Sequence, residues 1–287
     1  GLRNGPDIKR LQVAEARRED TRAATSIIQV VESEGWSTRR MKRDLPGFYE
    51  AEERNKLSHF TVQGFDLNGV IQAGANDGEE IENFIRMGID HLIAFEPLTS
   101  AFDILNERYG DKAHCFKLGL HDTNRMADLQ VTDIDGKGSS IFETEWEHPE
   151  VKRNWNQGQA AIVGKEEIEL VRFDTWAKQM HNRFYVDSRG QKRFIDLAQY
   201  DTLQLDTQGN EMEILLGMGK WLKQFKYLCI ELSVTPVYKG ETPGAEVAAW
   251  LKSRGFTLDS PIYEHNDCFF VRSDIKKESD QVYRGRC

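Results

Sequence analysis

Short apolar runs that alternate with helix-like stretches constrain the fold of this 287-residue chain more than any other feature. Between two neighbouring runs, Ile81, Phe84 and Ile85 mark the buried face of one helix. Such alternation is typical of βαβ units around a mainly parallel sheet with helices on both faces. The predicted strands are GVIQAG (69–74), HLIAFEP (91–97), AHCFKLGL (113–120), TLQLD (202–206) and YLCIELS (227–233). We therefore predict an α/β fold.

The C-terminal part completes the predicted sheet. A helix with Thr242 as its N-cap is expected to end at Gly255, and another with Thr99 as its N-cap is expected to end at Gly110. GFTLDSPIY and DCFFVRS then read as two strands of an antiparallel hairpin at the sheet edge. With the five strands above, they make a sheet of seven.

The chain is expected to have two parts. Residues 1–60 form a predicted helical extension, because apolar residues recur at helical spacing from Asp7 to Ser33. In one interpretation that helix packs on the main domain. In the other it forms either a subunit contact in a homo-oligomer or a lid. Residues 61–287 form the main domain. Its insertion 122–200 is long enough to suggest that it selects the substrate.

Charge and cysteine content limit the function. The net charge of −9 argues against a general nucleic-acid binder, which needs clustered Lys and Arg. The four cysteines form no metal-like spacing and suit a reducing compartment. No apolar run reaches the length of a membrane span, and the first residues lack the apolar stretch of a signal peptide. We therefore expect a cytoplasmic protein.

The stretch VIQAGANDGEE (70–80) indicates a ligand site. Gly74 and Gly78 form a turn between a strand and a helix, where backbone N–H groups can approach a ligand. Glu96 ends the second strand, a position from which a carboxylate binds both hydroxyls of a ribose. A dinucleotide fingerprint would place glycine where Asn76 stands, and no P-loop lysine follows. A nucleoside cofactor without phosphate fits best, and S-adenosylmethionine belongs to that class.

Four segments carry a closer resemblance. VIQAGANDGEEI, LIAFEP, LQLDTQGNEMEILLGM and YLCIELS resemble the motifs of the FkbM family of S-adenosylmethionine-dependent methyltransferases, and the likeness spans about Phe65 to Arg272. GSSIFE (138–143) and VRFDTW (171–176) are similar to two further family segments. The resemblance implies a Rossmann-like class I methyltransferase fold. It also places the turn GLHD (119–122) near the adenine.

The same resemblance implies the cofactor contacts. The predicted cofactor-binding residues are Gln72, Gly74, Asn76, Gly78, Glu96, Pro97, His121 and Asp122. Two positions depart from the family pattern: Gln72 stands where an acidic residue is usual, and Gln204 where lysine is frequent. We expect Gln72 to weaken cofactor binding without abolishing it.

Three carboxylates are candidates for catalysis. Methyl transfer to an alcohol needs a base or a metal, since the hydroxyl pKa lies far above 7. Asp206 follows the fourth strand, at the edge where open α/β sheets bind ligands, and Glu211 opens the next helix. Both could act in base catalysis or bind Mg²⁺, with Asp206 as the metal candidate, or they could only stabilise the helix N-terminus. Glu231 is either a site residue or the partner of a nearby Lys or Arg.

Aromatic residues and histidines of the loops allow two interpretations. His148 and His265 either line an acceptor pocket or lie at the surface. Trp146, Trp155 and Trp176 either stack on a sugar or belong to the core.

Four functions are considered on these grounds. The first is an O-methyltransferase acting on a hydroxyl of a sugar, glycan precursor or polyketide-like metabolite, a substrate class that comes from the resemblance alone. The second is a methyltransferase-like protein that binds a partner and has lost catalysis, for which Gln72 is the main argument. An RNA ribose methyltransferase ranks lower, because the basic residues of the insertion are diluted by acids. An NAD-type oxidoreductase is disfavoured by the missing G-x-G.

Overall fold

The computed structural model describes residues 56–61, 63–132, 136–145, 147–148, 151 and 161–275. The predicted helix from Asp7 to Ser33 lies outside the described residues. The chain divides into two compact units, residues 1–67 with 80–90 and residues 68–79 with 91–287. The described part of the first unit holds α5 (Ser58–Thr61) and most of α6 (Glu79–Arg86), and all strands belong to the second.

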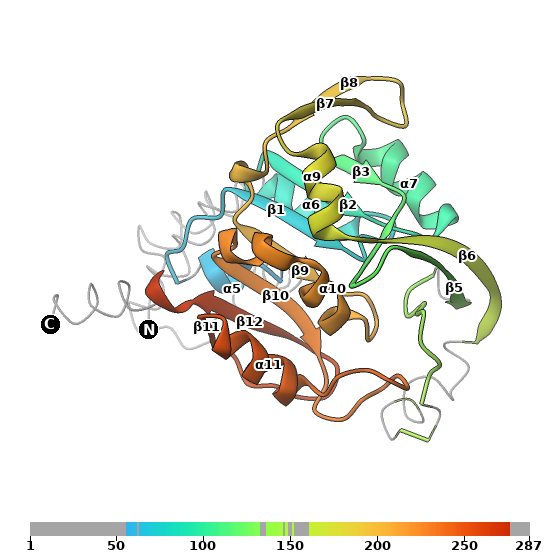
Figure 1. Cartoon of the computed structure of the whole chain (residues 1–287), viewed down its shortest axis with the longest axis vertical. Coiled ribbons are helices and arrows are strands. Elements are labelled where there is room, and N and C mark those ends of the chain that lie inside the picture. Colours follow the sequence, from blue (N-terminus) through green and yellow to red (C-terminus); the bar gives the residue numbers. More distant parts are fainter. Residues whose placement is uncertain are drawn as a thin grey trace, which may run out of the picture. The chain divides into compact units, whose positions relative to one another are not determined.

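The second unit is built on the predicted seven-stranded sheet (Figure 1). Its order is β3-β2-β1-β9-β10-β12-β11, and the five strands from β3 to β10 are parallel. The strands are β1 (Gly69–Ala73), β2 (His91–Phe95), β3 (His114–Phe116), β9 (Thr202–Leu205), β10 (Tyr227–Leu232), β11 (Phe256–Leu258) and β12 (Asn266–Arg272). Strand order reverses between β1 and β9, which is the topological switch point where such sheets bind ligands. This is the α/β class I methyltransferase fold that the sequence predicts.

The C-terminal hairpin is confirmed, with one refinement. β12 pairs antiparallel with both β10 and β11, so β11 forms the sheet edge. Helix α11 (Gly244–Ser253) has Pro243 at its N-cap and no side-chain cap, so the predicted Thr242 cap is wrong.

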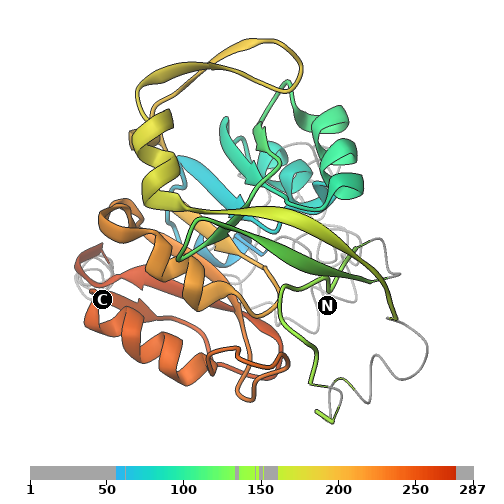
Figure 2. The same cartoon turned by 45° about the vertical axis from the view of Figure 1, so that its right-hand side comes forward.

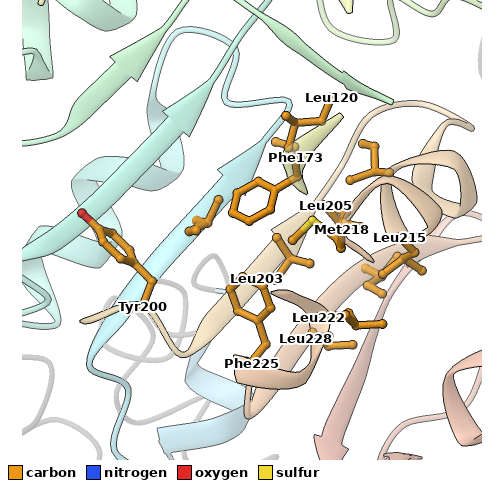
Figure 3. Packing of buried hydrophobic residues seen from close by; sticks show 14 of the residues in the cluster. Leu120, Phe173, Tyr200, Leu203, Leu205, Leu215, Met218, Leu222, Phe225 and Leu228 are labelled. Atoms are coloured by element: carbon orange, nitrogen blue, oxygen red, sulfur yellow. The ribbon is translucent and has the colours of Figure 1, made fainter. Parts of the chain in front are cut away.

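The main core lies on one face of the sheet (Figure 3). Helices α9 (Phe173–Met180) and α10 (Glu211–Gly217), the 3-10 helix η2 (Gly219–Gln224) and α11 pack there against apolar residues of β1, β2, β9 and β10. Trp176 belongs to this core, where it contacts Phe95 and Phe116, so its interpretation as a core residue is confirmed. Figures 1 and 2 show α7 (Thr99–Tyr109) on the other side of β2 and β3 from α9.

The predicted strand 113–120 is two strands in different sheets. It breaks at Lys117 and Leu118, after which β4 (Gly119–His121) leaves the main sheet and pairs parallel with β6 (Ile162–Arg172). β5 (Arg125–Thr132) pairs with the other edge of β6, which completes a three-stranded sheet. The insertion is therefore ordered over much of its length. It also contains the hairpin of β7 (Arg183–Val186) and β8 (Lys192–Ile195), followed by η1 (Leu197–Gln199).

Two helices begin at segments that the sequence analysis singles out. VRFDTW (171–176) contains the end of β6 at Arg172 and the start of α9 at Phe173, with Asp174 bound to the Arg172 guanidinium. Thr99 is the first residue of α7 rather than its cap. Its N–H donates to Glu166 of β6 at 3.0 Å, so a distant carboxylate supplies the missing cap. The predicted end at Gly110 is confirmed.

Candidate cofactor and acceptor sites

The β1 turn, residues 74–78, is held in shape by its backbone. Gly74, Asn76 and Gly78 all have positive φ angles, of 78°, 46° and 86°. A Cβ on Gly74 would collide with the carbonyl oxygen of Asp206, and one on Gly78 would lie 2.6 Å from the Tyr109 ring. Only glycine fits at these two positions, because both space and backbone conformation exclude a side chain.

Three strand ends meet at this turn. The N–H groups of Gly74 and Ala75 both donate to the Phe95 carbonyl of β2 at 3.1 Å. The N–H of Asp206, just after β9, donates to the Ala73 carbonyl at 3.1 Å. The turn therefore lies at the carboxyl edge of the sheet, on the switch point between β1 and β9.

Glu96 joins the β1 turn to the end of β2. Its Oε2 accepts from the N–H of Asn76 and its Oε1 from the N–H of Leu98, each at 2.8 Å. The side chain is buried, and this burial raises its pKa to about 7, although the two backbone donors work in the opposite direction. Each carboxylate oxygen has a second lone pair, so Glu96 can still accept from ribose hydroxyls. A nucleoside cofactor therefore fits the turn and this carboxylate.

The remaining predicted cofactor residues lie farther along the same edge. His121, at the end of β4, is buried, and burial lowers its pKa. Its Nδ1 lies 2.7 Å from Asp122 Oδ1, so the two residues form one unit. Asn210 joins this strand to the β9 turn by donating to the Leu120 carbonyl at 2.8 Å. Pro97 is half-buried between Glu96 and Leu98.

Gln72 and Gln204, the two departures from the family pattern, are cross-strand partners. They pair in register between β1 and β9, which are parallel, so both side chains lie on the same face of the sheet. Both side chains are fully buried. An acid and a lysine at these positions would form a buried ion pair, and here two neutral amides replace both charges together. Gln72 and Gln204 therefore form a pair of neutral side chains on adjacent strands, just before the β1 turn and the end of β9.

The β9 turn, residues 206–210, is held by side chains. Gln208 has a φ of 59°, and its Nε2 donates to Asp206 Oδ1 at 2.7 Å and to Glu231 Oε2 at 2.8 Å. The Tyr238 hydroxyl donates to Gln208 Oε1 at 2.6 Å, and this hydrogen bond fixes the orientation of the Gln208 amide. One glutamine therefore joins two carboxylates, that of Asp206 just after β9 and that of Glu231 near the end of β10.

The segment GSSIFE supports this arrangement from outside the sheet. Ser140 Oγ donates to the Gln208 carbonyl at 2.6 Å, and Thr144 forms a β-bridge with Tyr238. The Tyr238 ring packs against Gly209, whose φ of 99° and lack of a side chain make room for it. The serine-rich segment is therefore a brace for the β9 turn.

Two histidines lie near the carboxylates of β10 and its neighbouring loop. His265 Nε2 is 3.6 Å from Glu231 Oε1, and its side chain is partly exposed. His148 is buried and lies 3.9 Å from Glu264 Oε2, so its interpretation as a surface residue is wrong. Trp146 and Trp155 lie outside the described residues.

Glu211 braces the β9 turn from within. Its Oε1 accepts from the N–H of Thr207 at 2.8 Å and from the Thr207 hydroxyl at 3.0 Å. Its burial raises its pKa to about 7, and the Thr207 donors oppose that rise. A direct part for Glu211 in catalysis stays a prediction.

The family is decided by comparison with known proteins. A family model described as the methyltransferase FkbM domain matches residues 72–258, which is more than half of the chain. The chain belongs to the FkbM methyltransferase family. It is an S-adenosylmethionine-dependent methyltransferase, as its motifs predict. Cofactor binding by the β1 turn and Glu96 stays a prediction, and both lie inside the matched range.

The proteins named below are similar to this FkbM protein at low sequence identity. The 2-O-methyltransferase NoeI of Sinorhizobium fredii is 22% identical over 182 residues, which cover 61% of this chain and 67% of NoeI. Among solved structures, the magnesium protoporphyrin IX methyltransferase of Synechocystis PCC 6803 is 12% identical over 76% of each chain, with a TM-score of 0.36. Fibrillarin of Aeropyrum pernix is also 12% identical, over 76% of this chain and 75% of its own, with a TM-score of 0.38.

Two residues of the FkbM site are absent from the sequence predictions. Gln208 lies inside the D-x-x-G motif, at a position that carries no signal by itself. Tyr238 has no motif, and only the fold brings its hydroxyl to Gln208. Its deep burial raises its pKa well above the ordinary value, so it acts as a donor at neutral pH.

The magnesium prediction gains no support. Across the described residues, no group of three or more His, Cys, Asp or Glu side chains is arranged to hold a metal ion. In the same part of the chain, no helix has the length and apolar character needed to cross a membrane.

Proposed function

We propose that the protein is an O-methyltransferase that acts on a hydroxyl of a sugar, glycan precursor or polyketide-like metabolite. The observation that carries the proposal is the Asp206–Gln208–Glu231 unit, in which Asp206 lies at the switch point beside the β1 turn and shares a donor with Glu231 of β10. A hydroxyl needs a base to become a nucleophile, and these carboxylates meet that need.

The β1 turn and Glu96 would hold the cofactor, S-adenosylmethionine, whose sulfonium would supply an electrophilic methyl group. The acceptor oxygen would form its O–C bond to that methyl in line with the C–S bond that breaks. Asp206 takes the hydroxyl proton. Gln208 keeps the Asp206 carboxylate in place because its amide is fixed by Tyr238 and shared with Glu231.

The sugar class comes from the family resemblance alone, whereas the hydroxyl acceptor agrees with the name of one relative. NoeI is named as a 2-O-methyltransferase, which agrees with a hydroxyl acceptor. Polar side chains lie near this unit and in the neighbouring loops: His265 lies 3.6 Å from Glu231, Glu264 accepts from Thr235, and Glu143 pairs with Lys239. Polar groups of this kind suit the hydroxyl-rich surface of a sugar.

A methyl-transfer assay tests the proposal. The protein is incubated with methyl-labelled S-adenosylmethionine and a panel of free sugars, nucleotide sugars, oligosaccharides and hydroxylated polyketides. We expect an alkali-stable ether product from at least one panel member and no product with Asp206→Asn. Transfer only to an amine, a carboxylate or RNA would contradict the proposed acceptor class. Cofactor binding without transfer to any member would favour the partner-binding alternative.

A further inference from the structure

The hairpin of β7 and β8 has two unlike faces. Its inner face is fixed to the rest of the unit: Tyr185 OH lies 2.7 Å from His114 Nδ1, and Arg193 donates to the Gly110 carbonyl at 2.7 Å. Tyr185 also packs on Phe116, with 5.3 Å between the ring centroids. The hairpin is therefore a rigid projection, and both views show it standing away from the main sheet (Figures 1 and 2).

The outer face of the hairpin is apolar and exposed. Phe184, Val186 and Phe194 are 63%, 69% and 45% exposed, although most large apolar side chains of the unit are buried. Phe184 and Phe194 are register partners, with 5.0 Å between their ring centroids. Contiguous apolar groups on a fixed surface indicate an interaction site.

The hairpin is also rich in basic residues, of which Lys192 lies on this outer face and Arg193 on the inner one. Residues 183–195 carry four Lys or Arg side chains against a single Asp, whereas the whole chain has a net charge of −9. Lys192 lies on the outer face, with its Nζ 4.5 Å from the Phe184 ring centroid. The exposed Arg183 makes no ion pair with any residue of the described segments. The positive charge is therefore local to the hairpin.

The turn of the hairpin is ordered by one aspartate. Asp187 Oδ1 accepts from the N–H groups of Arg189 and Gln191 at 3.0 and 2.8 Å, and Gly190 has a φ of 77°. The apolar side chains and the cations thus keep fixed places relative to each other, because the turn and the inner face are both bonded.

We propose that the outer face of this hairpin docks the protein on the surface of an anionic lipid membrane. Apolar side chains that enter the headgroup region, with cations at the same level, match a peripheral anionic interface. Lys192 can extend its stem over the Phe184 ring and direct its ammonium to a lipid phosphate. Val186 has no ring to stack on a base, and the two phenylalanine rings pack against each other at a tilt of 51°, so the surface suits lipid better than nucleic acid.

Vesicle co-sedimentation tests the proposal without any methyl acceptor. The full chain is mixed with vesicles of phosphatidylcholine alone or of an equimolar mixture with phosphatidylglycerol. We expect binding to the anionic vesicles that weakens with added salt, and about ten-fold weaker binding for Phe184→Ser/Phe194→Ser. Lys192→Glu should weaken it about five-fold.

The matched control is Val163→Ser on β6. Val163 is 63% exposed, as is Phe184, but it lies away from the hairpin, so this variant should bind vesicles like the parent protein. Circular dichroism melting of each variant verifies that the fold is kept.

Three results would overturn the proposal. They are an absence of binding to anionic vesicles, equal loss of binding in Val163→Ser, and a change from dimer to monomer in the double variant by light scattering. The last result would assign the face to a second copy of the chain. Because the assay needs neither cofactor nor acceptor, its outcome is independent of the proposed methyl transfer.

Discussion

The β1 turn and the β9 turn lie side by side at one sheet edge but are built in different ways. The β1 turn depends on backbone geometry, with two glycines that tolerate no side chain. The β9 turn depends on a network of side chains, in which Gln208 joins Asp206, Glu231 and Tyr238. A turn that binds the same cofactor in every family member can be fixed by its backbone. A turn that serves different acceptors can instead be changed by substitution of its side chains. Each change below should therefore affect one turn more than the other.

Gly74→Ala should have the largest effect. The added methyl group collides with the Asp206 carbonyl in a backbone conformation that disfavours side chains, so we expect a loss of about 3 kcal/mol or more of unfolding free energy. Chemical denaturation measures this loss. Gly190→Ala is the control, because Gly190 has nearly the same φ, 77°, but open space around it. Equal losses in the two variants would refute the close packing between the turns.

Asp206→Asn should remove most of the turnover and leave cofactor binding intact. Loss of a general base lowers the rate by about 100- to 10,000-fold. The rate of methyl transfer to an identified acceptor measures the effect, and titration with S-adenosylhomocysteine is the control. Full activity would show that Asp206 is not the base.

Gln72→Asp should destabilise the protein by about 3–5 kcal/mol, because it buries one charge without a partner. Adding Gln204→Lys should restore part of the loss, since the two positions are in register between β1 and β9. Denaturation of both single variants and the double variant gives the coupling energy. Strictly additive effects would show that the two glutamines are independent.

Gln208→Leu should lower kcat/KM by about ten-fold, because two carboxylates lose their shared donor. Tyr238→Phe removes only the group that orients the amide, so its effect should be smaller. Steady-state kinetics on both variants checks this order. A larger loss in Tyr238→Phe would contradict the part assigned to Gln208.

Glu96 should make cofactor affinity depend on pH within a narrow range. Its pKa of about 7 means that it is ionised, and able to accept from two ribose hydroxyls, only at higher pH. Affinity for S-adenosylhomocysteine should therefore rise several-fold from about pH 6 to about pH 8. Calorimetry on Glu96→Gln is the control, and the same pH dependence in that variant would assign it to another group.

The raised pKa of Glu96 has the opposite effect on the stability of the protein without cofactor, which should fall as the pH rises. The folded pKa of Glu96 is raised above 4.5, and so is that of Glu211. Their contribution to stability is therefore complete below about pH 4.5 and is lost as the pH rises through about 7.

The sequence predicts the backbone-built part of the site and misses most of the side-chain network. Gly74, Gly78 and Glu96 follow from spacing alone, since strand ends and turns have fixed periods. Tyr238 lies 30 residues beyond Gln208 in a loop, and the pairing of Gln72 with Gln204 depends on strand register. Local sequence patterns predict neither the Tyr238–Gln208 hydrogen bond nor the pairing of Gln72 with Gln204. The break in the strand 113–120 was hidden for a similar reason, because β4 pairs with the distant strand β6.

The most direct test is isothermal titration of S-adenosylhomocysteine into the parent protein, Glu96→Ala and Asp206→Asn. It tests whether the β1 turn binds the cofactor and the β9 turn serves the acceptor. The structure predicts micromolar binding for the parent and for Asp206→Asn, and several-fold weaker binding for Glu96→Ala. Absence of binding to the parent protein, or loss of binding in Asp206→Asn alone, would contradict a cofactor site built on the β1 turn.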